Sequence, residues 1–304
     1  MTESHEPYAG PSYEGWEPTP SVVTEVVAPT PVQALAALLD DGRDVGPGDP
    51  LPPLWHWVAL PRWAASSVLG ADGHPRTGSF LPPVGLPRRM FAGGEVAWHR
   101  SPAVGEEVRS ESRVVSVTDK TGRSGPLVLV VVESRVLGAD GGLCLVERQD
   151  ILYREAGARS GTAPEPPLGQ EPSGPPLRRG PAPEDGWDVV TDPTVLMRFS
   201  AATANAHRIH YDWPYATGVE GYPGLVVHGP LMTLLLAESL WQAGELSGPA
   251  RLQHRNRAPL FCGQPARITH EHHPSGVLSL LSGADGAPRT TLDAHPLEKG
   301  TPHA

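Results

Sequence analysis

Two sets of strand-like segments, one in each half of the chain, dominate the hydrophobic pattern of this sequence. Each segment is short, rich in Val, Leu, Ile or Thr, and bounded by turns with Gly, Asp or Pro, which is typical of antiparallel sheets. The segments lie at residues 94–99, 108–118, 127–137 and 143–153 in the first half, and at 250–260, 266–273, 276–282 and 288–294 in the second. The pattern therefore predicts an antiparallel sheet in each half.

Two other segments have helical periodicity. Residues 30–41 place Pro31 at the first helical position and apolar residues at helical spacing, which predicts a short amphipathic helix. Residues 228–246 are apolar on nearly all sides, with Pro230 at an allowed first-turn position, and they predict a buried helix of about four turns. A buried helix wrapped by an antiparallel sheet is a hot-dog fold. We therefore expect an α+β protein with a double hot-dog fold, in which two antiparallel sheets each wrap a central helix and form a pseudo-dimer within one chain.

Proline and glycine indicate where these two units begin and end. The chain has 34 Gly and 36 Pro among its 304 residues, which argues against long helices and coiled coils. Residues 1–20 and 155–185 are polar and Pro-rich, so they are expected to be a disordered lead and a linker. The two hot-dog units are then expected at residues 21–154 and 186–304.

Charge and cysteine content narrow the class of protein. The formal net charge of -10 and the lack of a Lys/Arg block argue against a nucleic-acid partner. The sequence has neither a signal-peptide pattern nor a stretch of 18 apolar residues, so we expect no membrane span. Two cysteines cannot build a disulfide framework. These features predict a cytoplasmic protein, and we expect a monomer or a homodimer.

Reactive side chains are concentrated within residues 199–212. Asn205, His207, His210 and Asp212 lie within eight residues there, and histidine is the side chain that titrates near neutral pH without perturbation. Gly229 follows further along the chain, at the start of the predicted buried helix, where unpaired backbone N–H groups can stabilise a developing oxyanion. An acid–base group and an oxyanion site therefore occur in one short region. We accordingly expect the second unit to carry the catalytic groups and the first, degenerate unit to shape the substrate pocket.

Seven stretches of the chain together resemble the MaoC-like hot-dog hydratases. The resemblance is closer to the hydroxyacyl-thioester dehydratase type 2 branch, which includes mesaconyl-CoA and itaconyl-CoA hydratases. The stretches are LGADGHPRTGSFLPP (69–83), PRRMFAGGEV (87–96), GRSGPLVLVVVE (122–133), ERQDILYR (147–154), FSAATANAHRIHYDWPYA (199–216), EGYPGLVVHGPL (220–231) and RNRAPLFCG (255–263).

The resemblance implies a hydro-lyase that adds or removes water at the α,β double bond of an acyl thioester. His210 matches the central His of the family motif and would move the proton, while Asn205 stands where the wider family has Asp and would fix the water. The Gly229 N–H would hold the thioester carbonyl as it becomes enolate-like. His207, Tyr211, Asp212 and His228 are expected to support these groups, with Asp212 a candidate to orient an imidazole.

The resemblance also suggests how the substrate is held. Arg88 and Arg89 could meet the phosphates of coenzyme A or of a phosphopantetheine carrier protein, because a guanidinium binds phosphate as a fork. We expect no metal and no cofactor, since coenzyme A or phosphopantetheine is part of the substrate. A short dicarboxyl-type acyl chain and a fatty or polyketide-type hydroxyacyl chain both remain open.

Two alternative functions remain at this stage. A hot-dog thioesterase would need a carboxylate near the start of the helix to activate water, and Glu220 and Asp212 are the candidates. A catalytically silent thioester-binding subunit is the other alternative, because Asn205 replaces an acid. The order of the motifs and the presence of His210 favour the hydratase.

Overall fold

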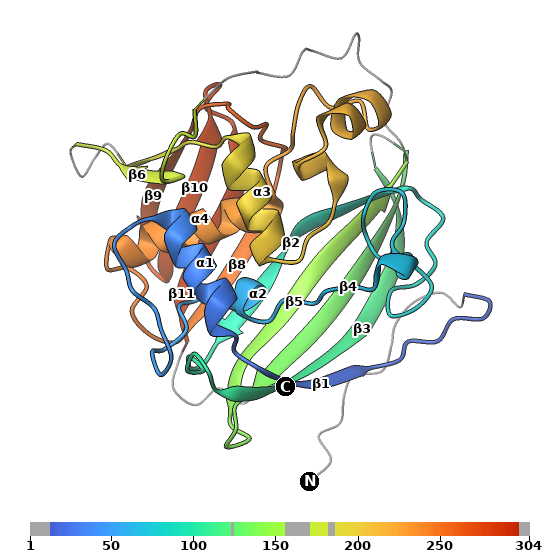
Figure 1. The fold of residues 1–304 in the computed structure, drawn as a ribbon, viewed down its shortest axis with the longest axis horizontal. Coiled ribbons are helices and arrows are strands. Elements are labelled where there is room, and N and C mark those ends of the chain that lie inside the picture. The colour runs from blue at the N-terminus through green and yellow to red at the C-terminus, as the bar shows by residue number, and fades with distance from the viewer. Residues whose placement is uncertain (1–12, 123–124, 156–170, 182–185, 298–304) are drawn as a thin grey trace.

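The strands of both halves form one continuous antiparallel sheet in the computed structural model, which describes residues 13–122, 125–155, 171–181 and 186–297 (Figure 1). Its strand order is β1-β3-β4-β5-β2-β8-β11-β10-β9-β7-β6. The strands are β1 (Ser21–Val26), β2 (Arg88–Trp98), β3 (Glu107–Gly122), β4 (Gly125–Leu137), β5 (Leu143–Arg154), β6 (Leu177–Arg179), β7 (Trp187–Val189), β8 (Ala250–Asn256), β9 (Ala266–His273), β10 (Gly276–Gly283) and β11 (Pro288–Pro296). The eight predicted strand segments are confirmed as β2 to β5 and β8 to β11.

The two halves meet edge to edge at β2 and β8. These strands pair antiparallel from Gly93 opposite Arg255 to Trp98 opposite Ala250. A Cβ atom on Gly93 would lie 2.4 Å from the carbonyl oxygen of His254, so only glycine allows this close approach of the two backbones. The two predicted sheets are therefore fused into one surface that spans both halves.

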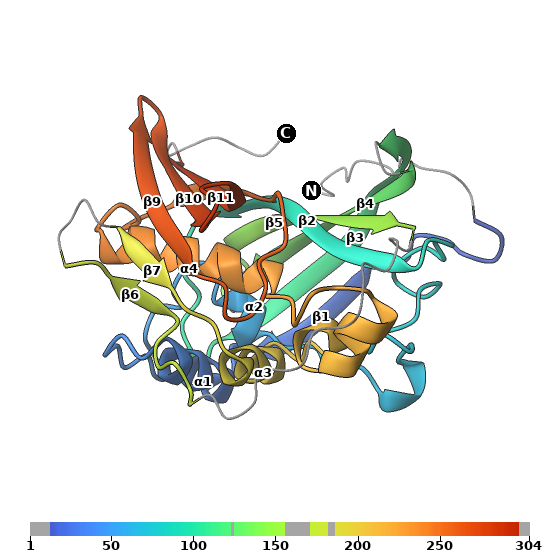
Figure 2. The same ribbon diagram turned by 90° about the horizontal axis from the view of Figure 1, so that it is seen from above.

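The helices lie together on one side of this curved sheet (Figure 2). They are α1 (Pro29–Leu39), α2 (His56–Ala59), α3 (Pro193–Ala202) and α4 (Gly229–Gln242), with short helical turns η1 (Ser66–Val68), η3 (Arg208–His210) and η4 (Tyr215–Val219). The α4 helix is the predicted central helix of the second half, and its residues 231–240 are all buried. No described helix is both long and apolar enough to cross a membrane.

The first half has a shorter helix than the second, as the sequence predicts. It contains α1 at the predicted place and α2, which has only four residues. The segment around α2 includes Pro52, Pro53 and Pro61, and proline ends a helix because it lacks the backbone N–H and clashes with the preceding turn.

The described parts of the predicted lead and linker pack against the rest of the chain. Residues 1–12 lie outside the described part, but Trp16 is buried and its indole N–H donates to the carbonyl of Ser79 at 2.8 Å. Of the predicted linker, residues 156–170 and 182–185 lie outside the described part, while Leu177 is buried in β6 at the sheet edge. In both segments one large apolar side chain finds a place in the core, which the proline-rich composition did not indicate.

One charged group lies deep in the apolar α4 helix. Glu238 accepts a hydrogen bond of 2.5 Å from the indole N–H of Trp55 and forms an ion pair with Arg43. Burial raises the pKa of Glu238 despite the neighbouring guanidinium. Because Arg43 and Trp55 belong to the first half, this buried group ties that half to the central helix of the second.

Candidate active site

A cavity of about 970 Å³ lies between the two halves and reaches the predicted catalytic segment. Its walls come from the segment after α2, from β2 to β5, from residues 203–210, and from the start of α4. The predicted site residues on these walls are Arg88, Arg89, Asn205, His207, His210 and Gly229. The structure thus brings six of the predicted residues to one cavity.

His210 is buried in η3, and its ring orientation is fixed by the backbone. Nδ1 lies 2.7 Å from the carbonyl oxygen of Val226. Because a carbonyl oxygen only accepts, Nδ1 carries the hydrogen and Nε2 is left as an acceptor. Burial lowers the pKa of His210 to about 4, although the hydrogen bond to Val226 opposes this shift. His210 is therefore a neutral base at neutral pH.

His228 connects His210 to the start of α4. Its ring stacks on that of His210 with centroids 3.6 Å apart, and its Nε2 lies 2.8 Å from Oγ of Ser200. Burial, and then the charges that His210 and His207 would carry, hold the pKa of His228 well below its usual value. His228 immediately precedes α4, so this stack places the His210 ring next to the helix N-terminus.

Gly229 is the first residue of α4, where a backbone N–H has no acceptor within the helix. The residue is tightly enclosed: a Cβ atom there would lie 2.6 Å from Nδ2 of Asn256 and 3.3 Å from Cδ1 of Phe91. A larger side chain would displace these neighbours. Gly229, with its N–H at the helix start, and His210 therefore line the same cavity, an arrangement suited to stabilising an oxyanion beside a base.

Asn205 and His207 shape the turn before His210. The side-chain oxygen of Asn205 accepts a hydrogen bond of 3.0 Å from the backbone N–H of His207. Burial, followed by the neighbouring histidines His74 and His210, lowers the pKa of His207 to about 2. Both residues line the cavity, and Asn205 also has a structural task in the turn.

Asp212 and Tyr211 stabilise the backbone of the segment. The Asp212 carboxylate accepts from Nε of Arg208 at 2.8 Å and from the backbone N–H of Tyr215 at 3.1 Å. The hydroxyl of Tyr211 donates to the carbonyl of Ala206 at 2.9 Å, and this side chain is 45% exposed. Asp212 is therefore paired with a guanidinium and not with an imidazole.

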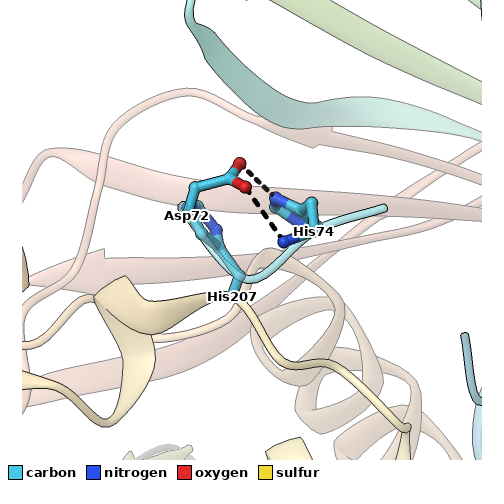
Figure 3. A group of neighbouring side chains, drawn as sticks. All are labelled: Asp72, His74 and His207. Carbon is cyan, nitrogen blue, oxygen red and sulfur yellow. Dashed lines mark hydrogen bonds and ion pairs between the residues drawn. The ribbon is translucent and has the colours of Figure 1, made fainter. Parts of the chain in front are cut away.

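Two residues that the sequence interpretation did not single out complete the cluster. Asp72 and His74 lie on the loop after η1, and Figure 3 shows them beside His207. The ring of His74 lies 4.1 Å, centroid to centroid, from that of His207. The stretch LGADGHP contained them, and an Asp and a His separated by one Gly in a predicted loop was the signal for a paired acid and imidazole.

The two adjacent arginines have different partners. Nε of Arg88 lies 3.0 Å from the Glu220 carboxylate, and a terminal nitrogen of Arg88 donates to the Glu220 carbonyl. Arg89 has no ion-pair partner among the described residues, and its charge contributes, after burial, to lowering the pKa of His74. Glu220 is occupied by Arg88, so it is a poor candidate to activate water for thioester cleavage.

Potential metal ligands come within 4.8 Å of one another in two places in the described residues, at Asp72, His74 and His207 and at His273, Asp293 and His295. In both groups the carboxylate is hydrogen-bonded to an imidazole, at 3.0 Å for Asp72 with His74 and 2.9 Å for Asp293 with His273. A hydrogen bond of this kind satisfies both partners without an ion. That the protein uses no metal stays a prediction.

Solved structures share the fold. HtdX from Mycobacterium tuberculosis superimposes with a TM-score of 0.61 at 18% identity, covering 91% of this chain and 99% of that one. Another M. tuberculosis protein, described as having a double hot-dog fold, superimposes with a TM-score of 0.50 at 17% identity over 93% of this chain and 98% of that one. The predicted double hot-dog fold is thereby confirmed.

The comparisons with known sequences place this chain among the acyl-thioester hydratases and dehydratases. Residues 54–262 match the family model for hydroxyacyl-thioester dehydratase type 2, so the chain belongs to that family. It is 44% identical over 265 residues to a mesaconyl-C(4)-CoA hydratase of Chloroflexus aurantiacus, covering 86% of this chain and 89% of the relative. These matches confirm the predicted activity, that of a hydro-lyase acting on acyl thioesters. They favour it over the two alternatives, a thioesterase and a silent binding subunit.

Proposed function

We propose that this enzyme reversibly hydrates the α,β double bond of a short enoyl-CoA whose acyl chain carries a free carboxylate in addition to the thioester. His210 carries the proposal, because its hydrogen bond to Val226 leaves Nε2 as an acceptor in a cavity beside the N-terminus of α4. The relative named mesaconyl-C(4)-CoA hydratase supports this class of acyl chain.

The proposed reaction uses the chain's own groups and needs no cofactor. The water oxygen bonds to Cβ while Nε2 of His210 takes a proton from the water. The π electrons move to Cα and the thioester oxygen, where the N–H of Gly229 stabilises the negative charge. The same proton then passes from Nε2 to Cα, which restores neutral His210 and completes the addition of water.

Arg89 is the group we propose for the free carboxylate of the acyl chain. It lines the cavity near His74 and His207, at the reacting end, whereas the phosphates of coenzyme A lie at the far end of the pantetheine arm. A guanidinium with no ion-pair partner in the described part of the chain is suited to a carboxylate, which it can bind through two parallel hydrogen bonds. This role replaces the phosphate contact expected from the sequence for Arg89.

The cavity wall formed by the first half of the chain favours a short, polar acyl chain. Alternate residues of three strands face it, and several are hydrophilic: Ser110, Ser112, Ser134, Glu147 and Gln149. Glu147 is buried and accepts from the indole N–H of Trp57 at 2.6 Å and from the amide of Gln149 at 2.9 Å. A long alkyl chain would desolvate these groups without replacing their contacts with water, which is unfavourable.

Three finer features accompany the proposal. We retain coenzyme A as the carrier in preference to a carrier protein, since the relative's name specifies a CoA ester. Arg88 keeps a predicted role near the phosphates, with the Glu220 ion pair as its partner in the free enzyme. A cytoplasmic location is supported by the two free cysteines, Cys144 and Cys262, and a monomer or homodimer by the single sheet that joins both halves.

The decisive experiment compares a panel of enoyl-CoAs with the wild type and three variants. We expect wild-type hydration of mesaconyl-C(4)-CoA, loss of hydration in His210→Ala, and for Arg89→Ala a KM increase of about tenfold or more that is confined to carboxylate-bearing chains. Arg148→Ala is the matched control, because Arg148 is exposed and does not line the cavity. An equal loss on crotonyl-CoA in Arg89→Ala would return Arg89 to the phosphate role.

A further inference from the structure

A loop of the first half is built onto the catalytic segment of the second. The carbonyl of Asp72 accepts a 2.9 Å hydrogen bond from the backbone N–H of Arg208, and the carbonyl of Ala71 accepts from Nη1 of Arg208 at 3.0 Å. Gly73 has a φ of +89°, and a Cβ atom there would lie 1.9 Å from the carbonyl oxygen of Ala206. The loop therefore fits against residues 206–208 with no room for a side chain at position 73.

This loop fixes the hydrogen positions of His74. The two carboxylate oxygens of Asp72 lie 3.0 Å from the backbone nitrogen and 3.0 Å from Nδ1 of His74. Burial alone would raise the pKa of Asp72, but the hydrogen bonds from His74 outweigh it and lower the pKa to about 2. An ionised carboxylate only accepts, so Nδ1 of His74 carries the hydrogen and Nε2 is an acceptor.

His74 and His210 therefore both line the cavity with Nε2 left as an acceptor. Both rings contact the ring of His207, with centroid distances of 4.1 Å and 5.4 Å. A water molecule has two hydrogens, and if it donates one to each Nε2, an oxygen lone pair stays available to attack Cβ. The amide of Asn205 is less suited to hold this water, because its oxygen already accepts from His207 and its nitrogen is a donor.

We propose that His74 is a second catalytic residue of this enzyme, whose Nε2 binds the water that adds to Cβ, and that Asp72 is its positioning residue. The inference rests on the proposed function. In hydration one O–H bond of the water breaks and its proton goes to His210, while the O–H bond held by His74 stays intact and becomes the hydroxyl of the product. In dehydration His74 accepts a hydrogen bond from the departing hydroxyl.

The first test measures steady-state hydration by His74→Ala and Asp72→Asn. We expect kcat to fall about 100-fold in His74→Ala. Asp72→Asn should lose a comparable factor, because an amide nitrogen facing Nδ1 favours the tautomer with hydrogen on Nε2. KM and the thermal midpoint should stay close to wild type. Matched controls are His272→Ala and Asp293→Asn, which alter an exposed imidazole and another His-bound carboxylate that do not line the cavity.

The second test separates water binding from proton transfer at Cα. A saturated acyl-CoA of the same chain class has no hydroxyl to lose, so exchange of its Cα hydrogen in D2O, followed by mass spectrometry, reports on His210 alone. We expect His74→Ala to keep this exchange while losing hydration, and His210→Ala to lose both. An equal loss of exchange and hydration in His74→Ala, or wild-type hydration in that variant, overturns the inference. A wild type that hydrates no enoyl-CoA would instead refute the proposed function.

Discussion

Nδ1 of His210 donates to the carbonyl of Val226 at 2.7 Å, and this hydrogen bond connects two motifs that are 16 residues apart in the sequence. The backbone N–H of Val226 returns a hydrogen bond of 3.0 Å to the carbonyl of Ile209. The residue that would move the proton is therefore locked, in position and in tautomer, to the strand-like segment that leads into α4. The proposed base and the proposed oxyanion site are therefore held by the same few backbone contacts.

The pH profile of hydration should reflect the burial of His210. Burial lowers its pKa to about 4, so Nε2 stays unprotonated through the neutral range. We expect kcat/KM to be nearly constant from pH 8 to about pH 5 and to fall as the pH approaches 4, because protonation removes the base. A fall centred near pH 6.5, the ordinary value for histidine, would contradict this assignment.

The lowered pKa of His210 also makes the free energy of unfolding depend on pH, so the pH profile needs a folding control. The unfolded chain protonates His210 near pH 6.5, whereas the folded chain does so only near pH 4. The unfolded state therefore binds more protons in this interval, and the free energy of unfolding decreases as the pH falls from 6.5 toward 4. Circular dichroism at each pH separates loss of the fold from loss of the base.

Gly229→Ala should damage the oxyanion site by a steric route. The new Cβ atom would lie 2.6 Å from Nδ2 of Asn256, so the first turn of α4 must shift. We expect kcat to fall about 100-fold, the effect of losing one oxyanion donor. The double variant Gly229→Ala with Asn256→Ala should recover part of this loss, since the clashing atom is gone.

Gly218→Ala is the matched control that tests whether the effect is local. Gly218 in η4 has no positive φ, and nothing lies within 4 Å of the position that a Cβ atom would take there, so Gly218→Ala should have wild-type kcat. If Gly229→Ala also has wild-type kcat, the N–H of that residue does not act on the substrate.

The strands and the central helix were predictable because their patterns are local. The β-rich runs bounded by turn residues and the apolar run of α4 need only neighbouring residues to be recognised. The fusion of the two sheets through β2 and β8 is different, since it depends on how Gly93 allows a backbone carbonyl 161 residues away, that of His254, to approach. The burial of Trp16 likewise depends on a distant partner, Ser79.

The site shows the same division between local and distant information. His210 and Gly229 were predicted from a motif and from the start of a predicted helix, and both line the cavity. The sequence offered Asp212 as a candidate to orient an imidazole, but its carboxylate pairs with the guanidinium of Arg208, one helical turn away. Asp72 and His74 were missed because their meaning arises only when their loop packs against His207, 133 residues further along the chain.

The buried group around Glu238 predicts a large effect on stability. Arg43→Met leaves the Glu238 carboxylate buried without its ion pair, and removing one partner of a buried pair costs about 3 to 5 kcal/mol. We expect the variant to unfold at clearly lower urea concentration. The double variant Arg43→Met with Glu238→Gln should recover most of the loss, since a neutral amide can still accept from Trp55.

The control for this prediction is an exposed ion pair. Arg62 and Glu25 lie 2.8 Å apart, but the Arg62 side chain is half exposed, so Arg62→Ala should change the free energy of unfolding by about 0.5 kcal/mol or less. Similar losses in Arg43→Met and Arg62→Ala would mean that burial does not distinguish the two pairs.

Gly73→Ala should uncouple the Asp72 loop from the catalytic segment while leaving the sheet intact. Two factors oppose the substitution: a φ of +89°, which strains any side chain, and a Cβ position 1.9 Å from the carbonyl oxygen of Ala206. Gly78→Ala separates them, because Gly78 has a φ of +96° but its nearest neighbour, Cβ of Pro83, is 3.6 Å from the new atom. If the docking of the loop matters for hydration, Gly73→Ala should lower kcat about tenfold or more, because a displaced loop misplaces the acid–base groups. Gly78→Ala should lose only some stability. Equal kcat values in the two variants would mean that hydration depends on backbone strain in this loop and not on its contact with the catalytic segment.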